Sequence, residues 1–379
     1  MAETHGYCDS AFKSVRELLA QRVANEYEVG AAICVNINGE DIVDIWSGYA
    51  DTERTKPWER DTLTAVWSCS KFVTNLAAMI LVDRGLLDPN ENVAKYWPEF
   101  AANGKENVKV SHIMSHTSGL PGWKGPISWE EVYDTKKSTD WLANQAPWWT
   151  PGECSGYHLI NQGHMMGEII RLISGKPLKQ FIADEIAGPL GANFTLGLPE
   201  RYWPCTAEPI PPPPLSLDGL DPSSVAAKAY AGPPISANVT MTSGFRGAEI
   251  GAANGFGNAR ALARIGSLVA LNGTVEGKTY LSPETINRMI DEQVSGLDLV
   301  LGHYIRFGLG VALPAPQTVP WIPEGRICFW GGWGGSIIIM DLERRMTIGY
   351  AMNKMGPGTL GNENTEIFVK EIYKIVNAL

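Results

Sequence analysis

The 379-residue sequence has no run of lysine and arginine, no long apolar segment and no closely spaced cysteines. With a formal net charge of −10, it offers no basic surface to nucleic acid or to an anionic membrane. No segment approaches the roughly 20 apolar residues that span a bilayer, and the polar, acidic N-terminus lacks the pattern of a secretory signal. From these absences we expect a small-molecule partner and no binding to nucleic acid or to membranes.

Cysteine and histidine provide little evidence for a disulfide framework or a metal site. His112 and His116 lie four residues apart, but no third ligand is evident near them. Gly255-Phe256-Gly257 does not occur in βαβ order, so it does not predict a dinucleotide site. We therefore expect no metal, no cofactor, and reduced thiols in a cytoplasmic protein. The cysteines are scattered and form no CxxC pair: Cys8, Cys34, Cys69, Cys154, Cys205 and Cys328.

Strand-forming segments and amphipathic helices both occur near the two ends of the chain. Two pairs of β-rich segments, each pair separated by a short turn, predict two β-hairpins. Apolar residues at helical spacing predict one helix before the first hairpin and another after the second. We expect the two chain ends to build one antiparallel sheet covered by helices, an α+β fold. The hairpins are residues 31–48 and 336–352, and the helices are residues 12–26 and 365–379.

The middle of the chain has the pattern of helices and loops. The predicted organisation is a sheet region of residues 1–71 and 298–379 and a mainly helical insertion of residues 72–297, with the active site between them. Within the insertion, the proline-rich residues 209–222 cannot form a helix interior. We expect them to form a surface loop or the edge of a lid.

The segment Ser68-Cys69-Ser70-Lys71 points to a particular chemistry. At the start of a helix, positions i and i+3 share a face, which brings the Lys71 amine near the Ser68 hydroxyl. Backbone N–H groups and the positive end of the helix dipole there favour negative charge on an attacked carbonyl oxygen. The pattern is common, however, and a serine at this place equally predicts a simple helix N-cap.

Further motifs follow the tetrad in a defined order. Residues 81–88 read LVDRGLLD, residues 96–100 read YWPEF and residues 116–121 read HTSGLP. This order resembles the serine β-lactamase and penicillin-binding-protein superfamily, and most of all the family VIII carboxylesterases, which are class C β-lactamase-like esterases. The resemblance extends over nearly the whole chain. It implies a β-lactamase/transpeptidase-like fold with Ser68 as the nucleophile.

Tyr157 is the third catalytic residue that the resemblance implies. The segment from Pro151 to His158 matches the esterase form of the second family motif. A tyrosine becomes a useful base only when a neighbouring ammonium stabilises its phenolate, a charge that Lys71 can supply. Alternatively, Lys71 is itself the base if burial lowers its pKa. The sequence leaves both assignments open.

The chain departs from the β-lactamase pattern in two places. Residues 157–159 read Tyr-His-Leu where these β-lactamases have Tyr-Ser-Asn, so the amide that contacts the lactam side chain is missing. Trp330, Gly331 and Gly332 stand where they have Lys-Thr-Gly, which removes a cation that helps to bind a carboxylate and adds apolar surface. Both changes predict neutral, hydrophobic esters in place of β-lactams.

Glycines around Trp333 let a strand edge lie close to a ligand without a side chain between them. By the resemblance, the backbone N–H groups of Ser68 and Trp333 form an oxyanion hole. Aromatic residues before Tyr157 are candidates for an apolar pocket. The residues expected to contact substrate are Trp123, Trp149, His158, Trp330, Gly331 and Gly332.

Together these residues predict a carboxylesterase-type serine hydrolase that cleaves neutral, hydrophobic esters or thioesters through an acyl-Ser68 intermediate. A more distant acyltransferase of the superfamily implies an alternative, in which the acyl group passes to an alcohol or amine in secondary metabolism. A non-catalytic binding protein on the same fold is a second alternative. The intact Ser68, Lys71 and Tyr157 argue against that last possibility.

Overall fold

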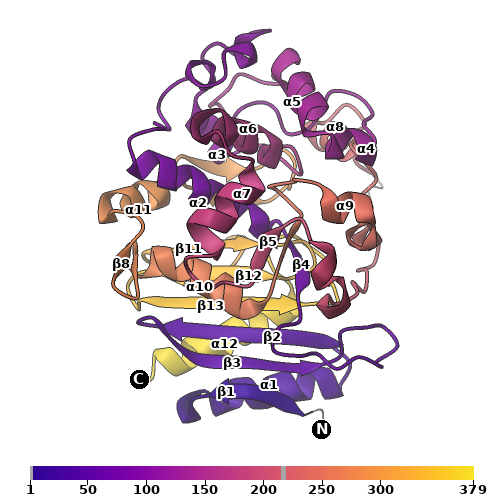
Figure 1. The fold of residues 1–379 in the computed structure, drawn as a ribbon, viewed down its shortest axis with the longest axis vertical. Coiled ribbons are helices and arrows are strands. Elements are labelled where there is room, and N and C mark those ends of the chain that lie inside the picture. The colour runs from indigo at the N-terminus through magenta and orange to yellow at the C-terminus, as the bar shows by residue number, and fades with distance from the viewer. Residues whose placement is uncertain (1–2, 215–218) are drawn as a thin grey trace.

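A six-stranded antiparallel sheet occupies the lower half of the molecule in Figure 1. The computed structural model describes residues 3–214 and 219–379. The strand order β1-β3-β2-β13-β12-β11 places strands from both ends of the chain side by side. These strands are β1 (Thr4–Cys8), β2 (Gly30–Ile37), β3 (Glu40–Gly48), β11 (Ile327–Gly331), β12 (Ile337–Asp341) and β13 (Met346–Met352).

Helices cover both faces of this sheet, which is why every residue of β12 and β13 is buried. α10 (Ala259–Ala270) packs on one face, and α1 (Lys13–Ala24) and α12 (Glu363–Val376) lie on the other. Glycine permits the close approach of α10, because a Cβ atom on Gly349 would lie 2.2 Å from the Ala259 carbonyl oxygen. The predicted α+β fold is confirmed.

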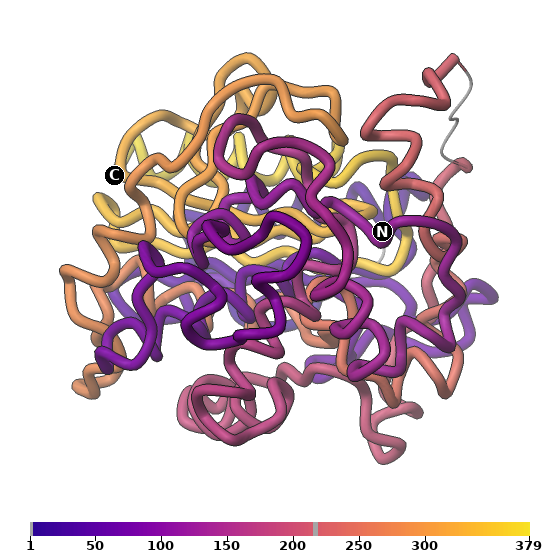
Figure 2. The backbone as a smooth tube through the Cα atoms, turned by 90° about the horizontal axis from the view of Figure 1, so that it is seen from above, coloured from indigo at the N-terminus to yellow at the C-terminus, as the bar shows by residue number. Residues whose placement is uncertain are grey.

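A mainly helical region lies above the sheet. Seen from above, its purple and magenta segments lie in front of the yellow strands (Figure 2). α2 runs through this region, and all its residues except Asp83 are buried. The helices are α2 (Cys69–Asp83), α3 (Val110–Met114), α4 (Trp129–Tyr133), α5 (Thr135–Asn144), α6 (Gln162–Ser174), α7 (Leu178–Ile182), α8 (Val225–Tyr230), α9 (Ser243–Gly247) and α11 (Pro283–Ile290).

Short strands connect this region to the sheet and shape the space between them. A three-stranded sheet has the order β4-β6-β5, and its strand β4 leads directly into α2. β9 and β10 form an antiparallel hairpin, as do β7 and β8. The strands are β4 (Thr64–Trp67), β5 (Phe194–Leu196), β6 (Gly255–Gly257), β7 (Thr274–Val275), β8 (Lys278–Thr279), β9 (Val294–Leu297) and β10 (Tyr304–Phe307).

The structure adds two features to the predicted organisation. β1 was not expected, and it pairs with β3 along an edge where a Cβ atom on Gly6 would collide with a main-chain oxygen. α10 lies within the predicted insertion of residues 72–297 but packs on the sheet. The division of the chain into a sheet region and an insertion stays a prediction. In the proline-rich segment, residues 215–218 lie outside the described residues.

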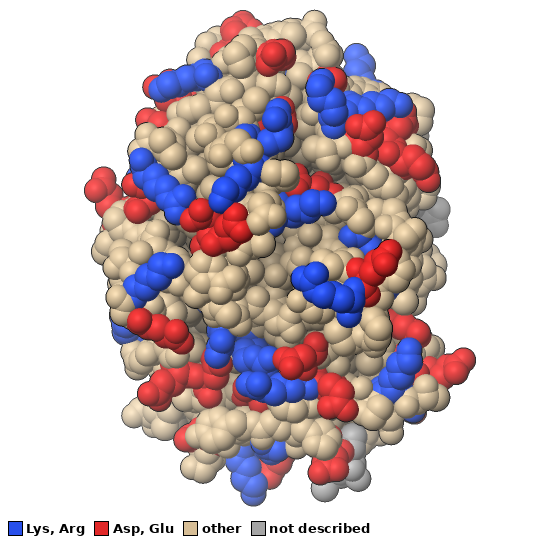
Figure 3. Space-filling model, viewed as in Figure 1, with Lys and Arg blue, Asp and Glu red and all other residues tan. Residues whose placement is uncertain are grey.

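The structure can be compared with the expectations for membrane spans, disulfides, metal sites and surface charge. No helix in the described part of the chain is long and apolar enough to cross a membrane. All six cysteines are free. Within residues 3–214 and 219–379, no group of three or more His, Cys, Asp or Glu side chains could hold a metal ion. On the face shown in Figure 3, Lys and Arg lie among Asp and Glu and do not gather into one patch.

Candidate active site

Ser68 lies at a sharp turn between a strand and a helix. β4 ends at Trp67, whose φ of 48° falls in the left-handed region that side chains other than glycine rarely adopt. Ser68 then takes the N-cap position of α2, but its side chain makes no capping hydrogen bond. Its hydroxyl is therefore available for a different interaction.

The hydroxyl of Ser70, the other serine of the tetrad, is used in hydrogen bonds within the protein. Its side chain is fully buried, and its hydroxyl donates to the Trp67 carbonyl oxygen at 2.5 Å. The Ser70 hydroxyl oxygen in turn accepts a hydrogen bond from the Gly255 backbone N–H at 2.8 Å. Ser70 thus joins the turn before α2 to β6, and its hydroxyl is committed to those contacts.

Lys71 is fully buried on the same face of α2 as Ser68. Its Nζ lies 3.1 Å from Ser68 Oγ. The same Nζ donates to the main-chain carbonyl oxygens of Leu159 at 2.8 Å and Ala252 at 3.1 Å. Burial lowers the pKa of the Lys71 ammonium well below its usual value, because the charged form loses its hydration. Burial therefore shifts Lys71 toward the neutral amine beside Ser68.

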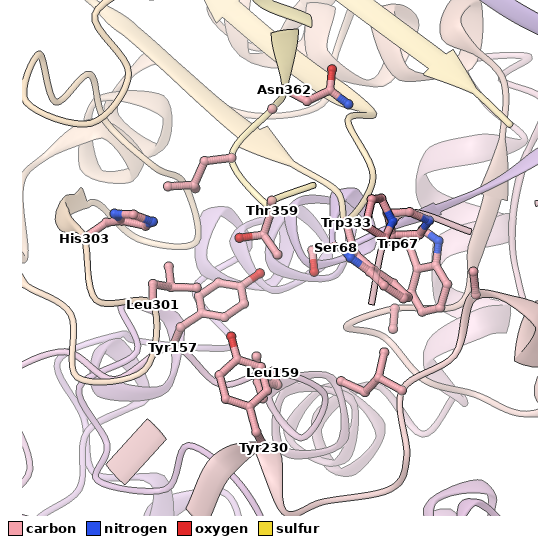
Figure 4. Close-up of a pocket in the computed structure, with 18 of the residues that line it drawn as sticks. Trp67, Ser68, Tyr157, Leu159, Tyr230, Leu301, His303, Trp333, Thr359 and Asn362 are labelled. Atoms are coloured by element: carbon pink, nitrogen blue, oxygen red, sulfur yellow. The ribbon is translucent and has the colours of Figure 1, made fainter. Parts of the chain in front are cut away.

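Tyr157 lies next to both residues. The centre of its ring is 4.8 Å from Lys71 Nζ, and Figure 4 shows Ser68 between Tyr157 and Trp333. Burial raises the pKa of the Tyr157 phenol, and the hydrogen-bonding groups of Ser68 and Trp330 offset part of that rise. The phenol, which carries a proton, is therefore the favoured form.

The Tyr157 ring belongs to a buried aromatic cluster. The ring centroids of His116, Phe307 and Trp330 lie 4.6, 6.5 and 6.3 Å from its own. Trp330, which was expected to contact substrate, packs against Tyr157 and is not part of the cavity lining. The cluster limits the orientations open to the Tyr157 ring.

The end of β11 approaches the Ser68 turn closely. A Cβ atom on Gly332 would lie 2.3 Å from the Val66 carbonyl oxygen, and one on Gly331 would lie 2.5 Å from another main-chain oxygen. Glycine is therefore required at both positions. Neither residue lines the cavity, whereas Trp333, which follows them, does.

Two backbone N–H groups point to a site for negative charge. Among residues 3–214 and 219–379, the amides of Ser68 and Trp333 donate to no other protein atom. One of them belongs to the N-terminal end of α2, where the helix dipole is positive. Two unpaired N–H groups in such a place can stabilise a carbonyl oxygen as it becomes negative.

A cavity of about 1080 Å³ opens beside Ser68. In Figure 4, Trp67 and Trp333 lie on one side of Ser68 and Tyr157 on the other. In the part of the chain that the structure describes, no Lys or Arg lines this cavity, and its acidic residues are Glu363 and Glu366. Its apolar lining includes Leu159, Ile160, Pro211, Pro212, Pro213, Pro214, Ile235, Leu301, Val319, Trp321 and Leu360.

Three further residues that were expected to contact substrate lie outside the cavity lining. The His158 ring is fully buried and bonds to the Ser118 hydroxyl at 2.6 Å and to a main-chain oxygen at 2.7 Å. The indole N–H groups of Trp123 and Trp149 each donate to a main-chain carbonyl oxygen. Because their polar atoms are occupied within the protein, the structure does not support direct substrate contact by these residues.

Other residues line the cavity although the sequence did not mark them as binding residues. Tyr230, at the end of α8, directs its hydroxyl into the cavity in Figure 4, and His303 lies on another side. Pro211 to Pro214 form part of the wall, and the proline run was the one available signal for them. No local pattern marks Tyr230 or His303, because only the fold brings them to Ser68.

Comparison with known proteins agrees with this arrangement. Residues 15–369 match the family model described as Beta-lactamase. The chain belongs to the beta-lactamase family. It is 31% identical to the esterase/beta-lactamase LipL of Mycobacterium tuberculosis over 363 residues, which cover 92% of this chain and 83% of LipL.

Solved structures of similar proteins extend the match to three dimensions. A family VIII carboxylesterase has a TM-score of 0.93 at 34% identity, covering 98% of this chain and 100% of its own. A penicillin-binding-protein homologue from Caulobacter crescentus has a TM-score of 0.91 at 33% identity, with the same coverage. The resemblance to the superfamily that the motif order indicated is confirmed, and the beta-lactamase fold extends over nearly the whole chain.

Proposed function

We propose that this protein is a carboxylesterase-type serine hydrolase that acts through an acyl-Ser68 intermediate. The observation that carries the proposal is the 3.1 Å separation between Lys71 Nζ and Ser68 Oγ at the edge of a large cavity. The names of LipL and of the family VIII carboxylesterase, both esterases, support it.

Lys71 is the base that activates Ser68. A neutral amine has two N–H groups and one lone pair. The N–H groups account for the bonds to the Leu159 and Ala252 carbonyl oxygens, so the lone pair is left to accept the Ser68 proton. Ser68 Oγ then attacks the ester carbonyl carbon, and Lys71 becomes an ammonium ion. The structure thus favours the lysine over the tyrosine among the two bases that the sequence left open.

Tyr157 completes the acylation step as a proton donor. As the tetrahedral intermediate collapses, the bond from carbon to the leaving oxygen or sulfur breaks, and the Tyr157 hydroxyl protonates the leaving group. The Lys71 ammonium returns a proton to Tyr157, so the proton balance closes. The N–H groups of Ser68 and Trp333 stabilise the oxyanion. Water then cleaves the acyl-Ser68 ester and restores the enzyme.

The cavity favours neutral, hydrophobic substrates. Its wall combines tryptophan, proline and aliphatic side chains, and its charged residues Glu363 and Glu366 are acidic. No described lining residue is a permanent cation that would bind a substrate carboxylate. The proposed partner is therefore a small neutral ester or thioester. For the protein itself we propose a cytoplasmic location, which the six free cysteines support.

Acyl transfer to an alcohol or amine is the second candidate function. The volume of about 1080 Å³ exceeds what a short ester fills and lies at the upper end for ligand sites. An acceptor alcohol could therefore bind beside the acyl group and take the place of water. The same Ser68 chemistry serves both outcomes.

Labelling with a fluorophosphonate probe, together with assays on short p-nitrophenyl esters, tests the proposal. We expect the probe to modify Ser68 and the enzyme to release p-nitrophenol. Ser68→Ala should lose both activities, whereas Ser70→Ala should keep both in its folded fraction. The absence of labelling and turnover in the wild-type protein would exclude the hydrolase. Product release that depends on added alcohol would favour the acyltransferase.

A further inference from the structure

Tyr157 is held by its main chain as well as by its ring. Three consecutive backbone N–H groups are bonded to residues far away in the sequence. Gly156 N–H donates to the His116 carbonyl oxygen at 2.9 Å, and His158 N–H donates to His116 Nδ1 at 3.0 Å. Between them, the Tyr157 N–H donates to Asp298 Oδ1 at 3.0 Å. The main chain of residues 156–158 is therefore held by His116 on one side and by Asp298 on the other.

Asp298 lies in the turn that joins β9 to β10, and only 1% of its surface is exposed. Besides the Tyr157 N–H, its Oδ1 accepts the N–H groups of Val300 and Leu301, both at 2.9 Å. A buried carboxylate is costly unless several donors stabilise it, and here these donors are all main-chain groups. One oxygen thus organises the turn and ties it to Tyr157.

The same turn is part of the cavity wall. Leu301 and His303 line the cavity, and the following strand β10 ends at Phe307, whose ring packs against Tyr157. A second main-chain bond joins the two segments, from the Leu299 N–H to the Ser155 carbonyl oxygen at 2.9 Å. Movement of the turn would therefore move the main chain that carries the phenol.

We infer that Asp298 is a positioning residue for the acyl-transfer reaction, whose carboxylate fixes Tyr157 so that the phenol faces Ser68. This inference rests on the proposed role of Tyr157. Asp298 does not touch the reacting atoms, since its contacts are with the main chain. It acts on the reacting atoms only through Tyr157.

Two substitutions separate the acceptor oxygen from the charge. Asp298→Ala removes the acceptor, so we expect kcat per folded molecule to fall by about tenfold to a hundredfold, the effect of misplacing a catalytic group by about 1 Å. Asp298→Asn keeps an oxygen in the same place and should stay within about threefold of the wild type. If Asp298→Ala fails to fold, Asp298→Ser replaces it in the experiment. The serine side chain is too short for its oxygen to reach all three donors.

A matched control separates positioning from general stability. Asp83 Oδ1 accepts hydrogen bonds from the Ser282 N–H, the Ser282 hydroxyl and the Thr285 hydroxyl at the far end of α2. Asp83→Ala removes a comparable set of bonds away from the cavity. It should lower the melting temperature and leave kcat per folded molecule unchanged.

The decisive comparison is a double-mutant cycle with Tyr157→Phe. If Asp298 acts through the phenol, Asp298→Ala should lower kcat in the wild type but add less than about threefold in the Tyr157→Phe background. An equal loss in both backgrounds, or an Asp298→Ala enzyme that behaves like Asp83→Ala, would overturn the inference. If the wild-type protein shows neither labelling nor turnover, the proposed function itself is refuted. Failure of the inference and failure of the proposed function are therefore distinguishable.

Discussion

The two walls that meet at Ser68 differ in the chemistry of their side chains. The α2 wall, made of Ser68 and Lys71, holds an amine that is fully buried and bonded to two carbonyl oxygens. The β11 wall, residues 330–333, holds two tryptophans and two glycines and no charge. On that wall, one indole packs against Tyr157 and the other lines the cavity.

This difference separates the reaction from the recognition of substrate. The α2 wall supplies proton transfer to and from Ser68, which any acyl group requires. The β11 wall supplies the shape of the strand end, an N–H group and apolar surface, and it has no cation for a carboxylate. The predictions below test first the groups that transfer protons and then the neutral lining of the cavity.

The largest effect is expected from Lys71→Met on the α2 wall. The substitution keeps the volume and removes the base, so kcat should fall about 10³-fold or more per folded molecule. Steady-state hydrolysis of a p-nitrophenyl ester measures it. Retention of more than a tenth of the wild-type kcat would contradict the assignment of Lys71 as the base.

Lys105 provides the matched control for that substitution. It is also buried, and its Nζ donates to the carbonyl oxygens of Ala102 and Gln145 away from the cavity. Lys105→Met leaves these oxygens without a donor and should cost about 1–3 kcal/mol of stability. Its kcat per folded molecule should stay within about twofold of the wild type.

Tyr157→Phe is expected to have the next largest effect. The ring and its aromatic contacts remain, but the proton donor for the leaving group is lost, so kcat should fall about 10²-fold. The loss should be smaller for esters with acidic leaving groups, which need less protonation. Tyr230→Phe, which removes another hydroxyl from the cavity, should change kcat by less than about threefold.

The pH profile of kcat/KM tests the state of Lys71. Burial lowers the pKa of Lys71 below its usual value, so kcat/KM should reach its plateau at a lower pH than an ordinary lysine amine would allow. Below the pKa of Lys71 the base is protonated, and kcat/KM should fall about tenfold per pH unit. Activity that instead rises continuously to about pH 10, the usual pKa of lysine, would contradict a neutral Lys71.

The smallest effect concerns the neutral lining of the cavity. A p-nitrophenyl ester whose acyl chain ends in a carboxylate should have a kcat/KM about tenfold lower than the neutral ester of equal length, because no described lining residue pairs with it. Glu366→Gln should reduce this discrimination. Equal kcat/KM values for the two esters would show that the cavity does not select against charge.

Sequence reasoning reached the parts of the fold that depend on local pattern. Alternation and turns predicted the two hairpins, and helical spacing predicted the terminal helices, because each pattern reports burial within one element. β1 was missed because its five residues are mostly exposed and its pairing with β3 is a long-range contact. The packing of α10 on the sheet could not be foreseen either, because it too is a long-range contact.

The candidate site also was predicted where the signal is local and was missed where long-range contacts decide. The spacing of Ser68 and Lys71 places them on one helix face, and the order of the motifs pointed to Tyr157. Residue type alone did not tell which aromatic rings face the cavity, since Trp123 and Trp149 are bonded within the protein. Asp298 carries no local signal at all, because its role arises from contact with a residue 141 positions away.

The intermediate itself offers the most direct test of the account. Wild-type enzyme is mixed with a slowly hydrolysed neutral ester, quenched in acid and digested for mass spectrometry. We predict that the mass of the acyl group is found on Ser68, is absent in Ser68→Ala and persists in Ser70→Ala. An acyl group on Ser70, or turnover in Ser68→Ala at the wild-type rate, would contradict the central claim.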